Sequence, residues 1–265
     1  MTGFHEGELA VQRRAGVQHQ ASRLAGMLAP PDLSGGARGF LAGRELAVLT
    51  ARDGAGLLWT VPLFGSPGFL DGDGQTLRVT AMPGGPLTEL PAGQQVGLVV
   101  IDFAARRRVR INGVLSNAGD SLEIAVEQAF GNCPRHIRPR HLEQAPAGET
   151  TDHTQLVEQA DTFFLGTVHP ARGVDSSHRG GPPGFVHVDG DDLWWPDYDG
   201  NTMFNSLGNI TVDNTTALLF LDFDSGTALH LTGRSEIEWT GTDRRVRFSP
   251  SQTVTSRTGW YAAAA

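Results

Sequence analysis

Residues 175–186 (Asp-Ser-Ser-His-Arg-Gly-Gly-Pro-Pro-Gly-Phe-Val) gather side chains that can bind an anion. Two hydroxyls, a histidine and an arginine precede a run of glycine and proline that is typical of a tight bend. Such a bend leaves backbone N–H groups pointing outward, and the guanidinium of Arg179 adds a rigid set of donors that suits a phosphate. An ordinary surface turn with polar side chains is the alternative that this stretch leaves open.

A second polar stretch, residues 196–209 (Pro-Asp-Tyr-Asp-Gly-Asn-Thr-Met-Phe-Asn-Ser-Leu-Gly-Asn), carries amides and hydroxyls that donate and accept hydrogen bonds. Aromatic residues within and beside it offer flat surfaces for a ring system. The part from residue 205 onward also fits the capped start of a helix that binds nothing. Together, the two stretches suit a flat heterocycle that carries a phosphate. The predicted binding residues are Ser176, Ser177, His178, Arg179, Gly180, Trp195, Asn201, Asn205, Ser206 and Asn209.

The elements that must position these residues occur twice in the chain. A Pro-Gly-Phe block recurs with its glycine at Gly68 and Gly184, 116 positions apart (184 − 68). An apolar run ending in Asp-Phe recurs at Phe103 and Phe223, 120 positions apart (223 − 103). Matching blocks in one order indicate an internal duplication. The first copy has residues 57–64 (Leu-Leu-Trp-Thr-Val-Pro-Leu-Phe) where the second has its polar stretch, so we expect the second copy to bind and the first to pack.

Short strands dominate both copies. Residues 46–50, 56–61, 76–80 and 97–103 are rich in β-forming side chains, and Asp-Gly turn signals separate several of them. Residues 121–130 fit either a helix face or an alternating strand, and we favour the strand because its counterpart in the second copy also alternates. Many short strands with tight turns and few helices predict a mainly β chain that forms small barrels.

The remaining segments predict how the chain is divided. Residues 6–29 have the apolar spacing of a helix that rests on a core, and Pro30 and Pro31 end it. A linker rich in Ala, Pro, Gly and Thr separates the copies, and a short helix follows it. We therefore expect a helical arm at 1–39, a first repeat at 40–143, a linker at 144–159, a second repeat at 160–250 and a tail at 251–265.

Composition excludes several classes of protein. The net charge of −8 argues against a nucleic-acid partner. No apolar run is long enough to span a membrane and no signal peptide opens the chain, so we expect no membrane partner. The single cysteine, Cys133, suits a reducing cytoplasm. All 21 basic residues are arginine, which excludes a lysine Schiff base and a P-loop.

Other reactive residues predict less. The nine histidines include no pair at i, i+4, and no Cys-x-x-Cys motif accompanies them, so we expect no metal site. Ser177 precedes His178 directly, and adjacent side chains on an extended chain point apart, which argues against a hydrolase. Arginines near Cys133 could favour its thiolate, but we favour a small buried side chain for it.

These motifs together resemble the pyridoxamine 5′-phosphate oxidase-like family of flavin-binding split barrels, in its tandem-barrel form. The resemblance covers residues 4 to about 248. It rests on residues 4–8 (Phe-His-Glu-Gly-Glu) with Gln12 and Arg13, the paired Pro-Gly-Phe blocks, residues 130–134 (Phe-Gly-Asn-Cys-Pro), 177–181 (Ser-His-Arg-Gly-Gly) and 201–209. It implies two tandem six-stranded antiparallel split β-barrels with short connecting helices, FMN as cofactor, two-electron redox chemistry and a homodimer.

One departure from the family bears on the site. Members often have arginine or lysine in the stretch that matches residues 200–209, where this chain has neutral amides and a serine. The resemblance therefore makes Arg179 the expected main contact of the phosphate. The leading hypothesis is a cytoplasmic FMN-dependent oxidoreductase acting on a small organic molecule. The alternatives are a haem-binding or haem-degrading split barrel with His136 or His178 as ligand, and a binding protein without a cofactor.

Overall fold

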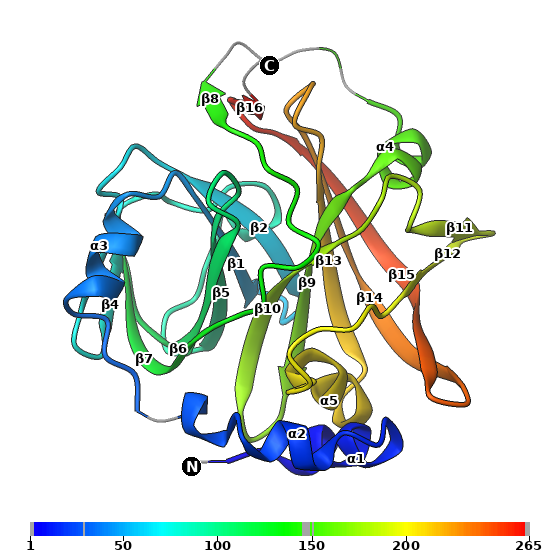
Figure 1. Ribbon diagram of the computed structural model, residues 1–265. Coiled ribbons are helices and arrows are strands. Elements are labelled where there is room, and N and C mark those ends of the chain that lie inside the picture. Colours follow the sequence, from blue (N-terminus) through cyan, green and yellow to red (C-terminus); the bar gives the residue numbers. More distant parts are fainter. Residues whose placement is uncertain (1–2, 29, 145–148, 150, 263–265) are drawn as a thin grey trace.

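Two antiparallel sheets of seven strands each form the body of the protein (Figure 1). The computed structural model describes residues 3–28, 30–144, 149 and 151–262; parts of the expected linker (145–148 and 150) and tail (263–265) lie outside these residues. The first sheet has the order β2-β1-β5-β6-β7-β4-β3, and the second has the order β10-β9-β13-β14-β15-β12-β11. The same order in two successive sheets confirms a mainly β fold of two tandem split barrels. Each sheet has seven strands, one more than the resemblance implies.

The elements of the first half precede and form the first sheet. They are α1 (Glu6–Arg14), α2 (Gln18–Ser22), η1 (Ala25–Leu28), α3 (Gly36–Ala42), β1 (Leu46–Arg52), β2 (Leu58–Phe64), β3 (Leu70–Asp73), β4 (Thr76–Val79), η2 (Gly85–Leu87), β5 (Gln95–Asp102), β6 (Arg107–Ala118) and β7 (Leu122–Gly131).

The elements of the second half form the second sheet and a small two-stranded sheet of β8 and β16. They are β8 (Leu142–Gln144), α4 (His153–Gln159), β9 (Thr162–His169), β10 (Gly173–Gly180), β11 (His187–Asp189), β12 (Asp192–Pro196), α5 (Asn205–Val212), β13 (Thr215–Leu221), β14 (Thr227–Thr240), β15 (Asp243–Arg257) and β16 (Trp260–Ala262).

Strand register confirms the duplication residue by residue. Leu49 of β1 pairs with Leu98 of β5, and their counterparts Leu165 and Leu218 pair in the same way in the second sheet. The rings of Phe103 and Phe223, which are equivalent residues, meet edge to face with 5.6 Å between their centroids. Equivalent residues touch when they lie near a twofold axis, so the repeats face each other across a pseudo-twofold axis.

Apolar packing holds this arrangement together. Each barrel has its own buried core, and a third buried cluster lies between the repeats. That cluster contains equivalent pairs such as Val48 with Phe164 and Val99 with Leu219. Strands β1 and β9 are buried on both faces, one toward the barrel core and one toward the other repeat. This explains why neither strand alternates strictly between polar and apolar residues.

Across the interface, the contacts follow the pseudo-symmetry. Strand β10 packs against β5 and β6 of the first repeat, and β2 packs against β13 and β14 of the second. The two edge strands β2 and β10 are equivalent, so each repeat offers its own edge to the other. Polar residues of β10 therefore face β6, and this contact forms the candidate site described below.

Several sequence predictions were wrong in detail. The helix expected at 6–29 is broken into α1, α2 and η1, because Gly16 has a φ of +70° that ends α1. Residues 251–257, expected in the tail, continue β15 and pair with β14. Residues 175–180, expected in a bend, form most of β10. The bend itself is limited to the residues between β10 and β11.

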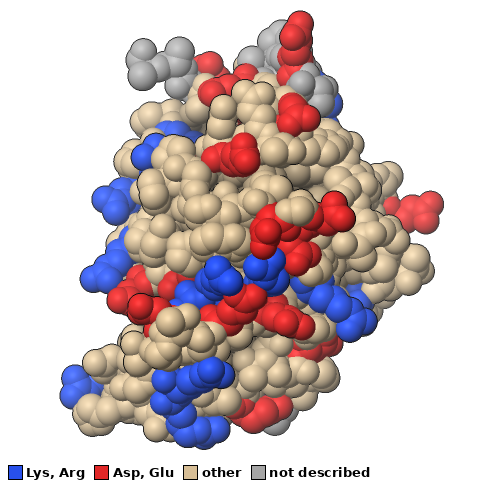
Figure 2. All heavy atoms as spheres, turned by 90° about the vertical axis from the view of Figure 1, so that its right-hand side faces the viewer, with Lys and Arg blue, Asp and Glu red and all other residues tan. Residues whose placement is uncertain are grey.

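Neither the surface charge nor the length of the helices indicates a particular kind of partner. On the face shown in Figure 2, arginine and acidic side chains lie side by side across the middle instead of forming a large area of one sign. Ion pairs on and beside β15 include Arg247 with Asp189 and Arg245 with Glu238. Among the described residues, no helix has both the length and the apolar character needed to cross a membrane.

The N-terminal arm docks beneath α5, the helix that carries part of the second polar stretch (Figure 1). The two helices cross at two glycines, because a Cβ on Gly7 would lie 2.1 Å from the carbonyl oxygen of Gly208. A Cβ on Gly208 would lie 2.6 Å from the backbone nitrogen of Glu8. The crossing therefore requires glycine on both helices.

Glu8 is buried at the same crossing, with 2% of its surface exposed. Its Oε2 accepts a hydrogen bond of 2.8 Å from the backbone N–H of His5, which completes a capping box at the start of α1. Its Oε1 lies 3.3 Å from the side-chain amide of Asn205 in α5. Burial raises the pKa of Glu8 from its ordinary value of 4.5 to about 7.

The first testable prediction concerns the glycine crossing. Gly208→Ala should lower the free energy of unfolding by about 1–3 kcal/mol, because the added methyl group has no space against α1. Gly39→Ala is the matched control, since Gly39 lies in α3 and nothing comes within 4 Å of its would-be Cβ. The control should be neutral or slightly stabilising. Urea unfolding of both variants is the measurement, and equal stabilities would contradict the close helix contact.

The second prediction concerns Glu8. Its raised folded-state pKa means that the unfolded chain ionises first, so the wild type should lose stability as pH rises from about 4.5 to 7. Glu8→Gln keeps the capping hydrogen bond without the charge and should gain up to about 3 kcal/mol over the wild type above pH 7. Glu6→Gln, in the same turn but exposed, should show no such gain. Parallel stability–pH curves for the wild type and Glu8→Gln would contradict a raised pKa of Glu8.

Candidate functional site

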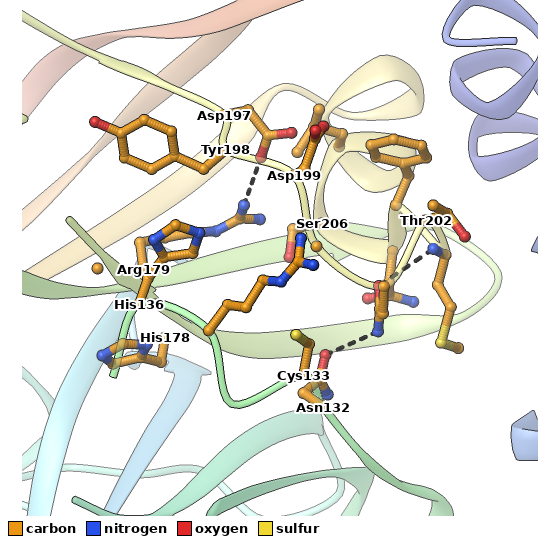
Figure 3. A pocket seen from close by; sticks show the side chains of 18 of the residues that line it. Asn132, Cys133, His136, His178, Arg179, Asp197, Tyr198, Asp199, Thr202 and Ser206 are labelled. Atoms are coloured by element: carbon orange, nitrogen blue, oxygen red, sulfur yellow. Dashed lines mark hydrogen bonds and ion pairs between the residues drawn. The ribbon is translucent and has the colours of Figure 1, made fainter. Parts of the chain in front are cut away.

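A pocket opens between the two repeats where β6 and the segment after β7 face β10, the loop after β12 and the start of α5 (Figure 3). It encloses about 810 Å³, including the open space at its mouth. The first repeat and the segment after it contribute Arg108, Arg110, Phe130, Asn132, Cys133, Arg135 and His136. The second repeat contributes His178, Arg179, Gly180, Trp195 and much of the stretch from residue 196 to 207.

Strand β10 places two neighbouring side chains in different surroundings. His178 is buried, and the rings of Phe103 and Phe164 meet its ring edge to face at 6.1 and 5.7 Å. Arg179 points the other way, where its Nη1 lies 2.7 Å from Oδ1 of Asp197 (Figure 3). The next residue is Gly180, and a Cβ at this position would lie 2.0 Å from the carbonyl oxygen of His136. The close approach of the two repeats thus requires this glycine.

Arginines outnumber their acidic partners in the pocket. Arg110 is paired with Asp175 at 2.9 Å, and Asp197 is shared between Arg179 and Arg244. Arg108 has no carboxylate partner among the residues that the structure describes. Within the described residues, its guanidinium makes two hydrogen bonds, both with His178, at 2.5 Å to Nδ1 and 3.3 Å to the carbonyl oxygen. The pocket therefore carries an excess of positive charge.

The protonation of these groups follows from burial. Burial, followed by the nearby charges of Arg110 and Arg179, lowers the pKa of Arg108 to about 9, so it stays charged at neutral pH. Burial, followed by the charge of Arg108, holds the pKa of His178 well below its usual value. His178 is therefore neutral. Because its Nδ1 faces the donor Arg108, its proton lies on Nε2.

Six buried nitrogen atoms that belong to lining residues have no hydrogen-bond partner. They are Arg108 Nε, Arg110 Nε, Asn132 Nδ2, His178 Nε2, Arg179 Nε and Trp195 Nε1. With the tautomer of His178 given above, all six are donors. Buried donors without acceptors are costly, so a ligand or an ordered water has to supply the acceptors here. The pocket is suited to a ligand rich in oxygen and negative charge.

Seven of the ten residues predicted from the sequence line this pocket: His178, Arg179, Gly180, Trp195, Asn201, Asn205 and Ser206. Ser176, Ser177 and Asn209 do not. The two serines are fully buried in β10, and Ser177 donates to the carbonyl of Leu165. Asn209 donates to Thr167 beneath α5. The predicted bend misplaced the serines, because they lie in a strand whose two faces are both covered, one by its own repeat and one by the other repeat.

The binding residues predicted from the sequence include none from the first repeat. Residues 108–112 alternate polar and apolar side chains, which is typical of a strand with one face in solvent. Instead, the polar face with Arg108 and Arg110 meets β10 of the other repeat. Two arginines on the same face of a short strand are the signal that could have indicated it. Cys133, for which a buried position was favoured, is only half-buried and lies at the pocket.

A second cluster of polar residues lies under the arm, where His5, Glu6 and His169 could hold a metal by distance alone. Backbone N–H groups of Gly7 and Ala171 donate to Nδ1 of His5 and His169, at 3.2 and 3.0 Å. These contacts place the proton of each neutral ring on Nε2, the atom that faces the cluster. A metal needs the lone pair at that atom, so the cluster is not suited to bind one. The predicted lack of a metal site stays a prediction.

In the comparison with known protein families, one family model matches the second repeat. The family model described as pyridoxamine 5′-phosphate oxidase matches residues 149–259. None of the curated proteins matches the chain.

Solved structures similar to the chain include the following three. HupZ of Group A Streptococcus is 12% identical and matches 44% of this chain and 100% of its own, with a TM-score of 0.32. A protein of Clostridium acetobutylicum related to general stress protein 26, of the pyridoxinephosphate oxidase family, is 18% identical over 38% of this chain and 83% of its own (TM-score 0.30). The heme storage protein HutZ of Vibrio cholerae is 8% identical over 40% and 89% (TM-score 0.30).

Proposed function

We propose that the chain, whose residues 149–259 match the pyridoxamine 5′-phosphate oxidase family model, is an FMN-dependent oxidoreductase with its flavin in the pocket between the repeats. The observation that carries the proposal is the set of six buried donors without acceptors in that pocket. FMN offers acceptors of the matching kind, namely phosphate oxygens, hydroxyls and ring carbonyls. The substrate is a small organic molecule, as the family resemblance implies.

Arg108 is the residue best suited to hold the phosphate. It is charged, lines the pocket and has no carboxylate partner among the described residues, whereas Asp197 already holds Arg179. A guanidinium can hold a phosphate with two parallel hydrogen bonds, and each charge-assisted bond contributes about 1.5–3 kcal/mol. We therefore assign the main phosphate contact to Arg108 and a supporting contact to Arg179, the residue first expected from the sequence.

Flat side chains at the mouth of the pocket would hold the ring. His136 and Tyr198 stack with 5.0 Å between their centroids (Figure 3). Phe204 also lines the pocket. When bound, FMN supplies two-electron transfer. The chain's own residues would orient the ring, exclude water and supply positive charge that favours a gain of electrons in the pocket. Asn132 and Trp195 would donate hydrogen bonds to ligand oxygens.

Haem is less suited to the same pocket. An axial histidine needs its Nε2 lone pair, but Nδ1 of His178 accepts from Arg108, which leaves the proton on Nε2. His178 would have to lose this contact and leave its place between two phenylalanine rings. His136 is exposed at the mouth, and its ring is stacked on Tyr198. These contacts favour flavin over haem.

The third prediction tests the phosphate contact. Arg108→Ala should weaken FMN binding by about 2–4 kcal/mol, or roughly 30- to 1,000-fold, because it removes a bidentate charged donor. Arg179→Ala should cost about tenfold or less, since the carboxylate of Asp197 already balances the charge of Arg179. Fluorescence titration of the apo-protein with FMN measures both effects, and the same titration with riboflavin isolates the phosphate.

Riboflavin affinity should change little in either variant, because riboflavin has no phosphate. Arg245→Ala is the matched control, since Arg245 pairs with Glu238 and is not among the lining residues. Equal losses for FMN and riboflavin would show that Arg108 does not hold the phosphate. A wild type that binds neither flavin would contradict the proposed function.

A further inference from the structure

We propose that each chain has one complete ligand pocket and that the pseudo-symmetric counterpart of this pocket is closed, so that a single chain holds one ligand without a partner subunit. The identity of the ligand as FMN rests on the proposed function; the single open pocket does not. The inference follows from comparing each pocket residue with its equivalent in the other repeat.

Strand register defines the equivalent positions. Val99 pairs with Arg110 in the first sheet and Leu219 pairs with His230 in the second, so Arg108 and Arg110 correspond to Ala228 and His230. In the same way, Phe164 pairs with His178 and Val48 pairs with Pro62. His178 and Arg179 therefore correspond to Pro62 and Leu63. The counterpart site has no arginine at the positions equivalent to Arg108, Arg110 and Arg179.

The replacements are packed instead of exposed. Ala228 is fully buried in the apolar cluster between the repeats. Leu63 has 1% of its surface exposed and belongs to the core of the first barrel. The positions that carry charged side chains at the pocket are thus occupied by packed apolar side chains at its counterpart.

His230 completes the closure in place of Arg110. Its Nδ1 lies 2.9 Å from the carbonyl oxygen of Thr60, and its Nε2 lies 2.8 Å from the hydroxyl of Ser256. Both ring nitrogens are used, whereas six donors at the open pocket have no partner. The short helix η2 lies over this site, since a Cβ on Gly85 would come within 3.3 Å of His230 Nε2. A ligand would find neither space nor free donors there.

The chain length between matched blocks shows how the asymmetry arose. The offset between repeats is 116 at β9 and β10 but 120 at β13 and β14, so the second repeat has four more residues between them. That interval contains residues 196–204 and the start of α5, which form one wall of the pocket. The first repeat has η2 in the corresponding interval. The longer connection builds a wall, and the shorter one fills the space.

Both walls of the open pocket come from one chain. Residues of β6 and β7 belong to the first repeat, and residues of β10, β12 and α5 belong to the second. The pseudo-twofold contact between repeats therefore supplies what two separate chains would otherwise have to supply. The homodimer expected from the sequence is not needed to complete the site.

The fourth prediction tests the asymmetry without any flavin. Cys133, the only cysteine, lines the open pocket and should react readily with an anionic aromatic disulfide. In a Cys133→Ser background, Arg108→Cys should also react, whereas Ala228→Cys at the equivalent position should react at least roughly 100-fold more slowly because it is buried. Comparable rates for the two introduced cysteines, in variants with native-like melting, would overturn the inference.

Ligand stoichiometry provides the second readout, including for the case that Ala228→Cys fails to fold. Calorimetric titration of the full wild-type chain with FMN, combined with sedimentation to give the mass in solution, should yield one FMN per chain. Two per chain would mean an open counterpart, and one per two chains would mean a site shared between subunits; either overturns the inference. If FMN does not bind, the proposed function fails, while the wild-type Cys133 rate and the cysteine pair still decide whether one side alone is open.

Discussion

The buried ion pair between Arg110 and Asp175 is the contact on which the pocket depends. It joins β6 of the first repeat to β10 of the second at 2.9 Å, and the two side chains are 10% and 2% exposed. Asn112 and Ser206 also donate to Asp175, so residues from both repeats share this carboxylate. Removing one partner of such a pair would leave an uncompensated buried charge. The pair therefore fixes how the repeats meet, and with that the position of Arg108 and His178.

Duplication of one barrel gave the fold two equivalent interfaces, and each repeat uses them differently. At the apolar centre, equivalent residues such as Phe103 and Phe223 pack against each other across the axis. Away from the centre, one side keeps arginines and unmatched donors and the other has alanine, leucine and a satisfied histidine. Stability thus comes from the symmetric part of the interface, and binding from the part where symmetry is lost.

The sequence allowed the repeat, the strand nature of residues 121–130 and most of the second repeat's pocket residues to be predicted, because each depends on local pattern. Constant offsets report duplication directly, and alternation reports a strand. Arg108 and Arg110 were missed because alternation tells which residues share a face but not what that face meets. Ser176 and Ser177 were misplaced for the related reason that turn residues at 181–184 were extended backward into a strand. The break of the arm at Gly16 needed a backbone angle that spacing does not supply.

The absorption spectrum of the full chain, purified and then incubated with FMN and freed of excess, tests the central claim most directly. The account predicts flavin absorption bands that stay with the protein and are perturbed relative to free FMN, because the ring lies in a pocket with reduced access to water. A Soret band in the purified protein, or a spectrum without any flavin band after incubation, would contradict the assignment of the pocket to a flavin.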